Sequence, residues 1–167
     1  MTKTFLQLVK EQITGKEILD NGKGFVSIKL SKEQQDQFHA LLKEFGIKDP
    51  VDEMHVTLAH DKRNPNVDIE IDPGAEYKAE IVDLDVMGEG KWKAIVLKLH
   101  SQEMIERHNH LRELGYHHTY PQFIPHVSLK YKPTDQDIEA VKDKLDVFKK
   151  HFPMLIFNDE QAEKIEE

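Results

Sequence analysis

The chain has 167 residues, which suits one domain with a buried core, and we expect a single domain over residues 1–167. Hydrophobic residues make up 38% of it and charged residues 32%, a balance typical of a globular protein and not of a disordered one. A net charge of −8 argues against binding long nucleic acid, the absence of cysteine excludes disulfides and thiolate metal sites, and no apolar run is long enough to span a bilayer.

The first part of the chain predicts a leading helix and then a strand–helix–strand unit. Helical spacing of apolar residues indicates a short helix at residues 3–13. Alternation predicts a strand over residues 25–30, and Ser31 is a good N-cap for a helix at about 32–45. A strand with β-branched residues comes next, at 54–60.

The second part predicts a hairpin, a helix and a strand, and then one more helix and strand. Ser101 is again a good N-cap, here for the helix at 102–114. The expected elements are strands at 76–87 and 91–99, a helix at about 102–114, a strand at 126–131, a helix at about 135–150 and a strand that begins near Pro153.

The same order of elements occurs twice. A strand, a serine-capped helix, a glycine stop and a strand that begins with histidine occupy about 24–60 and again about 91–131, and we expect these segments to form two lobes. The last strand of each copy carries the same type of tetrapeptide: His55-Val56-Thr57-Leu58 and His126-Val127-Ser128-Leu129.

In a strand, residues two apart share a face, so His55 lies on the same face as Thr57, and His126 on the same face as Ser128. Lys130 is expected to continue the polar face of the second motif. If the two strands face one another, a neutral imidazole can accept a proton and a protonated one can donate it, while the hydroxyls hold phosphate oxygens. A single motif of this kind is usually an exposed polar residue in a strand. Two in equivalent units favour catalysis.

Other candidate residues each have two interpretations. Trp92 is expected at the start of a strand, where it either stacks on a nucleotide base or closes the hairpin edge. Tyr120, in the loop before His126, either stacks on a base or packs within the loop. His60 comes five residues after His55 and is expected on the opposite strand face. No metal site is expected, because the remaining histidines lack partners at ligand spacing.

With these two motifs the chain resembles the 2H phosphoesterase superfamily, from about Phe25 to Phe157. The resemblance implies an α+β, bilobal (LigT-like) fold in which two pseudo-twofold-related antiparallel sheets form a central groove with helices outside. It also implies metal-independent acid–base chemistry on phosphodiesters. The residues that match the superfamily motifs are His55, Thr57, His126 and Ser128.

Within that superfamily the chain is similar to phage anti-CBASS proteins, which degrade cyclic oligonucleotide signals of bacterial immunity. The similarity rests on size, acidity, the segment before Gly24-Phe25-Val26-Ser27 and the approach from Phe123 to His126. It implies hydrolysis of 3′,5′-linked cyclic di- or trinucleotides. The substrate would be a small nucleotide, and neither a cofactor nor a membrane is expected to take part.

Two alternatives remain open at this point. One is an RNA end-processing 2′,3′-cyclic phosphodiesterase, and the other is a non-catalytic module that sequesters a nucleotide. The N-terminus lacks the apolar core of a signal peptide, so we expect a cytoplasmic protein. The sequence leaves the base preference, the ring size and the oligomeric state open.

Overall fold

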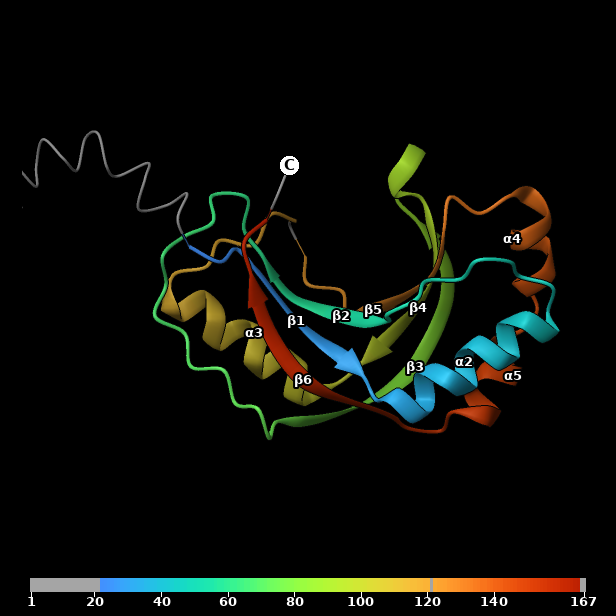
Figure 1. Ribbon diagram of the computed structural model, residues 1–167, viewed down its shortest axis with the longest axis horizontal. Coiled ribbons are helices and arrows are strands. Elements are labelled where there is room, and N and C mark those ends of the chain that lie inside the picture. Colours follow the sequence, from blue (N-terminus) through green and yellow to red (C-terminus); the bar gives the residue numbers. More distant parts are fainter. Residues whose placement is uncertain (1–21, 121, 166–167) are drawn as a thin grey trace, which may run out of the picture.

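The computed structural model describes residues 22–120 and 122–165, so the helix expected at 3–13 lies outside the described residues (Figure 1). The protein is α+β, as expected. Its strands are β1 (Phe25–Leu30), β2 (His55–His60), β3 (Glu76–Met87), β4 (Ala94–His100), β5 (His126–Tyr131) and β6 (Leu155–Glu163). Its helices are α2 (Lys32–Glu44), the 3₁₀ turn η1 (Gly90–Trp92), α3 (Gln102–Leu114), α4 (Asp135–Val141) and α5 (Leu145–His151).

The six strands form one antiparallel sheet in the order β2-β1-β6-β3-β4-β5. The expectation of two separate sheets is therefore wrong. The first residues of the long strands β3 and β6 pair with one another, from Glu76 opposite Asn158 to Ala79 opposite Leu155. Beyond that junction β6 pairs with β1, and β3 pairs with β4. The sheet thus has a first half (β2, β1, β6) and a second half (β3, β4, β5).

The strands bend into a trough, with the helices along its outer side and its mouth at the upper edge of the view (Figure 1). Alternation explains why one face is covered. The outer face carries the buried apolar residues of each strand, and the helices bury their own apolar residues against it. Among these residues are Val26, Ile28, Val56, Leu58, Leu97, Val127 and Leu129 of the strands, and Phe38, Leu42, Met104 and Leu111 of the helices. The inner face of the trough carries most of the polar side chains of β1, β2 and β5.

Most of the expected elements are confirmed within a residue or two. The exception among the helices is the segment at 135–150, which is two helices, α4 and α5, separated at Lys142–Lys144. Ser101 caps α3 by accepting a hydrogen bond from the N–H of Met104, whereas Ser31 makes no such bond to α2. Thr134 caps α4 through a reciprocal pair of bonds with Asp137.

The expected strand at 91–99 begins later, at Ala94, and Trp92 lies in η1 instead. Gly88, which precedes this turn, has a φ of +81°, and a Cβ there would lie 2.4 Å from the carbonyl oxygen of Trp92. The hairpin therefore needs glycine at that position. The turn is the short yellow-green helix that projects at the upper edge of Figure 1.

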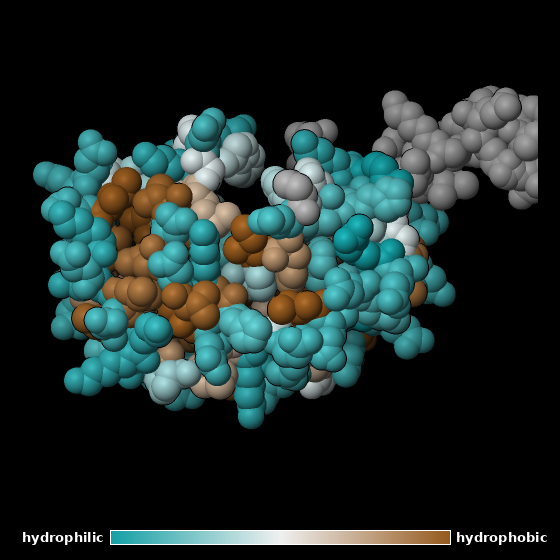
Figure 2. All heavy atoms as spheres, turned by 180° about the vertical axis from the view of Figure 1, so that it is seen from behind, coloured by the Kyte–Doolittle hydropathy of each residue, from teal (hydrophilic) through white to brown (hydrophobic). Residues whose placement is uncertain are grey.

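Seen from behind, the molecule is hollowed at its upper edge, where the trough opens (Figure 2). Apolar side chains gather over the half that carries α2, α4 and α5, and the other half is hydrophilic. Among residues 22–120 and 122–165, the structure has no helix of the length and apolar character required to cross a membrane.

Candidate active site

The two motif histidines begin β2 and β5, the strands at the two ends of the sheet order, and these strands lie side by side across the trough. Equivalent backbone bonds hold the residue before each histidine. The N–H of Leu30 donates to the carbonyl of Met54 at 3.0 Å, and the N–H of Leu99 donates to the carbonyl of Pro125 at 2.9 Å. Each histidine therefore enters its strand at the same point of an equivalent ladder.

A second pair of equivalent bonds shows that the two strands run in opposite directions. Val51, which precedes β2, donates its N–H to the carbonyl of Leu129 near the end of β5. Thr119, which precedes β5, donates its N–H to the carbonyl of His60 at the end of β2. The end of each strand thus lies beside the approach to the other, which is the relation of a twofold axis.

Both histidine rings are fixed by the same contact. The Nδ1 of His55 lies 3.3 Å from the carbonyl oxygen of Glu53, and the Nδ1 of His126 lies 2.7 Å from that of Ile124, each two residues earlier. Because a carbonyl only accepts, Nδ1 carries the proton in both rings and Nε2 is left with a lone pair. Among the described residues, no hydrogen bond engages either Nε2.

The environment of His126 favours its neutral form. Burial lowers the pKa of this half-buried ring, and the nearby charges of His55 and Lys98 lower it further, while the bond to Ile124 opposes them. The influence of His55 on this pKa also means that the two imidazoles are close enough to interact electrostatically. The strands therefore bring the two rings together.

Thr57 and Ser128 each come two residues after a histidine and lie on the same face of the sheet, as the alternation predicts. In the described ranges, neither hydroxyl takes part in a hydrogen bond with the protein. Both side chains are half-buried. We call the face that carries His55, Thr57, His126 and Ser128 the histidine face.

Each motif contains a β-bulge at the same point. Because of the extra residue, the side chains after the bulge lie on the face of the sheet opposite to the one that regular alternation predicts. In β2, Thr57 pairs with Ser27 and Ala59 with Val26, so Leu58 is the extra residue. His60 then pairs with Phe25 and returns to the histidine face, so the expectation that it lies on the opposite face is wrong.

The corresponding bulge in β5 falls at Leu129, because Ser128 pairs with Val96 and Lys130 with Ile95. The bulge turns Lys130 to the helix side, so the expectation that it continues the polar face is wrong. Its Nζ donates to the carbonyl oxygens of Lys48 and Asp49, at 2.6 and 3.3 Å. Tyr131 occupies the place on the histidine face that His60 has in the first motif.

A lysine on the neighbouring strand pairs with each of the two motif histidines. Lys29 of β1 is opposite His55, and Lys98 of β4 is opposite His126. Lys29 forms ion pairs with Glu53 and Asp159, and Lys98 forms one with Asp85 at 2.9 Å. Sequence reasoning missed both, although each lies in a similar run, Ile28-Lys29-Leu30 and Leu97-Lys98-Leu99, that could have drawn attention to them.

Tyr120, in the loop before β5, lies beside the end of β2, with its ring centroid 5.6 Å from that of His60 and 5.7 Å from that of His118. It is 57% exposed and, with His118 and Arg112, lines a polar pocket of about 390 Å³. Trp92, by contrast, is 70% exposed in η1, at the tip of the hairpin, where the Nζ of Lys91 lies 5.1 Å from the centroid of its ring.

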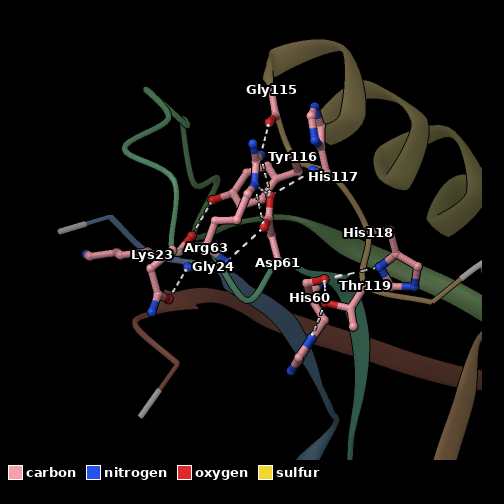
Figure 3. A network of polar contacts seen from close by, with 11 residues as sticks. Lys23, Gly24, His60, Asp61, Arg63, Gly115, Tyr116, His117, His118 and Thr119 are labelled. Carbon is pink, nitrogen blue, oxygen red and sulfur yellow. Dashed lines mark hydrogen bonds and ion pairs between the residues drawn. The ribbon is translucent and has the colours of Figure 1, made fainter. Parts of the chain in front are cut away.

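A polar network holds the corner that carries His60, His118 and Thr119 (Figure 3). Buried Asp61 accepts hydrogen bonds from the Arg63 side chain and from the N–H of His117. Burial alone would raise the pKa of Asp61, but these bonds outweigh it and hold the pKa below its usual value. The loop before β5 is thereby fixed to the end of β2.

His60 itself is bound to that loop through Thr119. The Thr119 hydroxyl donates to the His60 carbonyl at 2.7 Å, so its oxygen accepts from His60 Nδ1 at 2.9 Å. Burial lowers the pKa of His60. For the neighbouring His118, burial and then the nearby His108 and His60 lower the pKa to about 4. Neutral rings therefore dominate this corner.

The arrangement has the parts of an acid–base site for a phosphoryl group: two Nε2 atoms that bind no other residue in the described part of the chain, two hydroxyls and two lysines on one face. In residues 22–120 and 122–165, no group of three or more histidine, aspartate or glutamate side chains is placed to hold a metal ion.

The protein-family model described as Anti-CBASS protein Acb1 matches residues 23–166 of the chain. An anti-CBASS protein Acb1 of Vibrio phage KVP40 is 32% identical over 109 residues, which cover 64% of this chain and 71% of the relative. That of Salmonella phage S16 is 28% identical over 109 residues, 64% of this chain and 70% of the relative. That of Escherichia phage RB16 is 24% identical over 142 residues, 84% of this chain and 77% of the relative.

Proposed function

The chain belongs to the Anti-CBASS protein Acb1 family, and from this premise we propose that it is a phosphodiesterase that cleaves 3′,5′-linked cyclic oligonucleotides without a metal ion. Such cleavage would counter CBASS immunity, in keeping with the name of the phage relatives, and we place it in the cytoplasm of the infected cell. The proposal includes membership of the 2H phosphoesterase superfamily. The observation that carries it is the equivalent setting of His55 and His126.

In the proposed reaction, His126 acts as the general base. Its Nε2 takes the proton from the ribose 2′-hydroxyl, and the 2′-oxygen forms a bond to phosphorus. The bond from phosphorus to the 5′-oxygen breaks, and His55 donates a proton from Nε2 to that oxygen. The products are a 2′,3′-cyclic phosphate and a free 5′-hydroxyl. The lowered pKa of His126 supports its role as the base, because the base must begin neutral.

The groups around the histidines have supporting roles in this proposal. The carbonyls of Glu53 and Ile124 hold each ring by Nδ1 and stabilise the imidazolium when Nε2 is protonated. Thr57 and Ser128 donate to the non-bridging phosphate oxygens, whose charge grows in the transition state. Lys29 and Lys98 supply the positive charge that Lys130, bound to two carbonyls, is not placed to give.

The test is incubation with cyclic di- and trinucleotides and with 2′,3′-cyclic mononucleotides in EDTA, with products identified by mass. We expect cyclic oligonucleotides to be linearised and 2′-deoxy analogues to resist. His55→Ala and His126→Ala should each lower the rate by roughly 10²–10⁴-fold while substrate binding persists. Lys142→Met, at an exposed residue just after α4, is the control.

Other outcomes would select the alternatives. Cleavage confined to 2′,3′-cyclic ends would indicate an RNA end-processing enzyme. Tight binding with no product from any ligand would indicate a sequestering module. Equal cleavage of ribose and 2′-deoxy rings would contradict attack by the 2′-hydroxyl and point to activated water.

A further inference from the structure

The bulge residue Leu58 has no partner in the ladder with β1, and its carbonyl is bonded to a helix instead. Leu58 is fully buried. Its carbonyl oxygen lies 2.6 Å from the Nδ1 of His108, a buried residue of α3. Because a carbonyl only accepts, Nδ1 carries the proton and donates it. A side chain of α3 therefore holds the backbone of β2 directly after Thr57.

The ring of His108 is fixed in orientation and favoured in its neutral form. It stacks on the ring of Phe123, with centroids 4.0 Å apart and 4° between the planes, and the ring of His118 meets it edge-on. His108 is only 4% exposed. Burial lowers its pKa, the bond to Leu58 opposes this, and the charge of Arg112 lowers the pKa further. A neutral imidazole has one N–H, and the bond to Leu58 uses it.

The second motif holds its bulge in a different way. The carbonyl of Leu129, the extra residue of β5, accepts a hydrogen bond from the backbone N–H of Val51 at 2.8 Å. A backbone donor remains when a side chain is exchanged, whereas the donor to Leu58 is lost with His108. The two bulges are equivalent in position but differ in their donors, so Ser128 is an internal reference for the first motif.

We propose that His108 is a positioning residue for the first motif, whose Nδ1–H fixes the Leu58 bulge and thereby aims the hydroxyl of Thr57 at the phosphate. This inference rests on the proposed function. His108 itself contacts neither the substrate nor the reacting atoms. Without its N–H the buried carbonyl has to turn toward another donor, and the strand moves with it. A displacement of about 1 Å is enough to slow a catalysed reaction.

Two amide side chains test where the donor must lie. Asparagine places an N–H close to the position of Nδ1, whereas glutamine places it further out, near that of Nε2. We expect His108→Asn to keep kcat close to the wild-type value and His108→Gln to lower it by about 10-fold, the loss expected for one phosphate hydrogen bond. His110→Gln, at an exposed histidine of the same helix, is the matched control. Urea denaturation establishes that each variant is folded.

A double-mutant cycle separates positioning from general destabilisation. If His108 acts through Thr57, His108→Gln should cost little once Thr57→Val has removed the hydroxyl, and should still cost about 10-fold beside Ser128→Ala. The cycle is measured for kcat with 3′,5′-linked cyclic di-adenylate and for Kd with its 2′-deoxy analogue, whose binding needs no cleavage. If His108→Gln does not fold, Phe123→Leu removes the stacked ring instead and should couple to Thr57 in the same way.

Equal effects of asparagine and glutamine at His108, or equal coupling to Thr57 and Ser128, would overturn the positioning role. Coupling to Thr57 in Kd, with no turnover by the wild-type protein, would support the positioning role and refute the proposed chemistry. Turnover by the wild-type protein, with additive losses in both kcat and Kd, would support the chemistry and refute the positioning role.

Discussion

Replacement of Lys98 by methionine should shift the acidic limb of the pH–rate profile to higher pH. Lys98 is directly opposite His126 in the ladder, and its charge lowers the pKa of that ring. The acidic limb reports loss of the neutral base as pH falls through its pKa. Removing the positive charge makes protonation of His126 easier, so its pKa rises and activity is lost at a higher pH.

The size of the shift can be worked from the geometry. The Lys98 side chain is 28% exposed, so water screens its charge in part. Directly opposed residues have Cβ atoms about 5 Å apart, so a charge separation of about 6 Å is a fair estimate. With a dielectric constant of roughly 40–80, the repulsion is about 0.7–1.4 kcal/mol. That energy corresponds to about 0.5–1 pH unit.

The assay is initial rate against pH, from about pH 4 to 9, at substrate concentrations below KM. Lys98→Arg keeps the charge and should leave the limb in place. Lys142→Met is the matched control, because Lys142 also forms an ion pair but lies just after α4, outside the histidine ladders. A limb that stays in place in Lys98→Met, or moves equally in Lys142→Met, would refute the assignment of His126 as the base.

Three further outcomes are expected. Thr57→Val and Ser128→Ala should each lower kcat by about 10-fold, less than the loss of a histidine does, because each removes one hydrogen bond to the phosphate. Steady-state kinetics checks this prediction, and unchanged rates would mean that these hydroxyls do not contact the phosphate. The free energy of unfolding should fall by about 1–3 kcal/mol as the pH falls from about 6.5 to 4. The reason is that the pKa of His118 is lowered to about 4 in the folded protein, so this ring stays neutral at a pH where the unfolded ring takes a proton. In urea denaturation His118→Gln should flatten this pH dependence, and an unaltered dependence would contradict the lowered pKa of His118. Activity should persist in EDTA, and its loss with recovery on adding zinc or manganese would refute the two-histidine mechanism.

Much of the candidate site can be predicted from local pattern. The local pattern of apolar and polar residues predicted the bounds of five of the six strands to within three residues. The repeat of the His-apolar-Thr/Ser-apolar motif singled out His55 and His126. Alternation also placed Thr57 and Ser128 correctly, because only one residue separates each from its histidine. Such short-range relations need no knowledge of a neighbouring strand.

The positions beyond each motif depended on pairing between strands. A bulge exists only relative to a partner, and a slip of one residue moves every later side chain to the other face. For that reason sequence reasoning assigned His60 and Lys130 to the wrong face of the sheet and did not single out Tyr131. Pairing with β1 sets the face of His60, and pairing with β4 sets the faces of Lys130 and Tyr131.

The sequence by itself determined the elements, the two histidines and the hydroxyl that accompanies each. Only the tertiary structure decided that one bent sheet joins the two halves through β3 and β6, that Lys29 and Lys98 lie opposite the histidines, and that burial lowers the pKa of His126. The physical reason is the range of the interactions. Propensity and alternation act between neighbours along the chain, whereas register, burial and charge proximity arise between strands far apart in sequence.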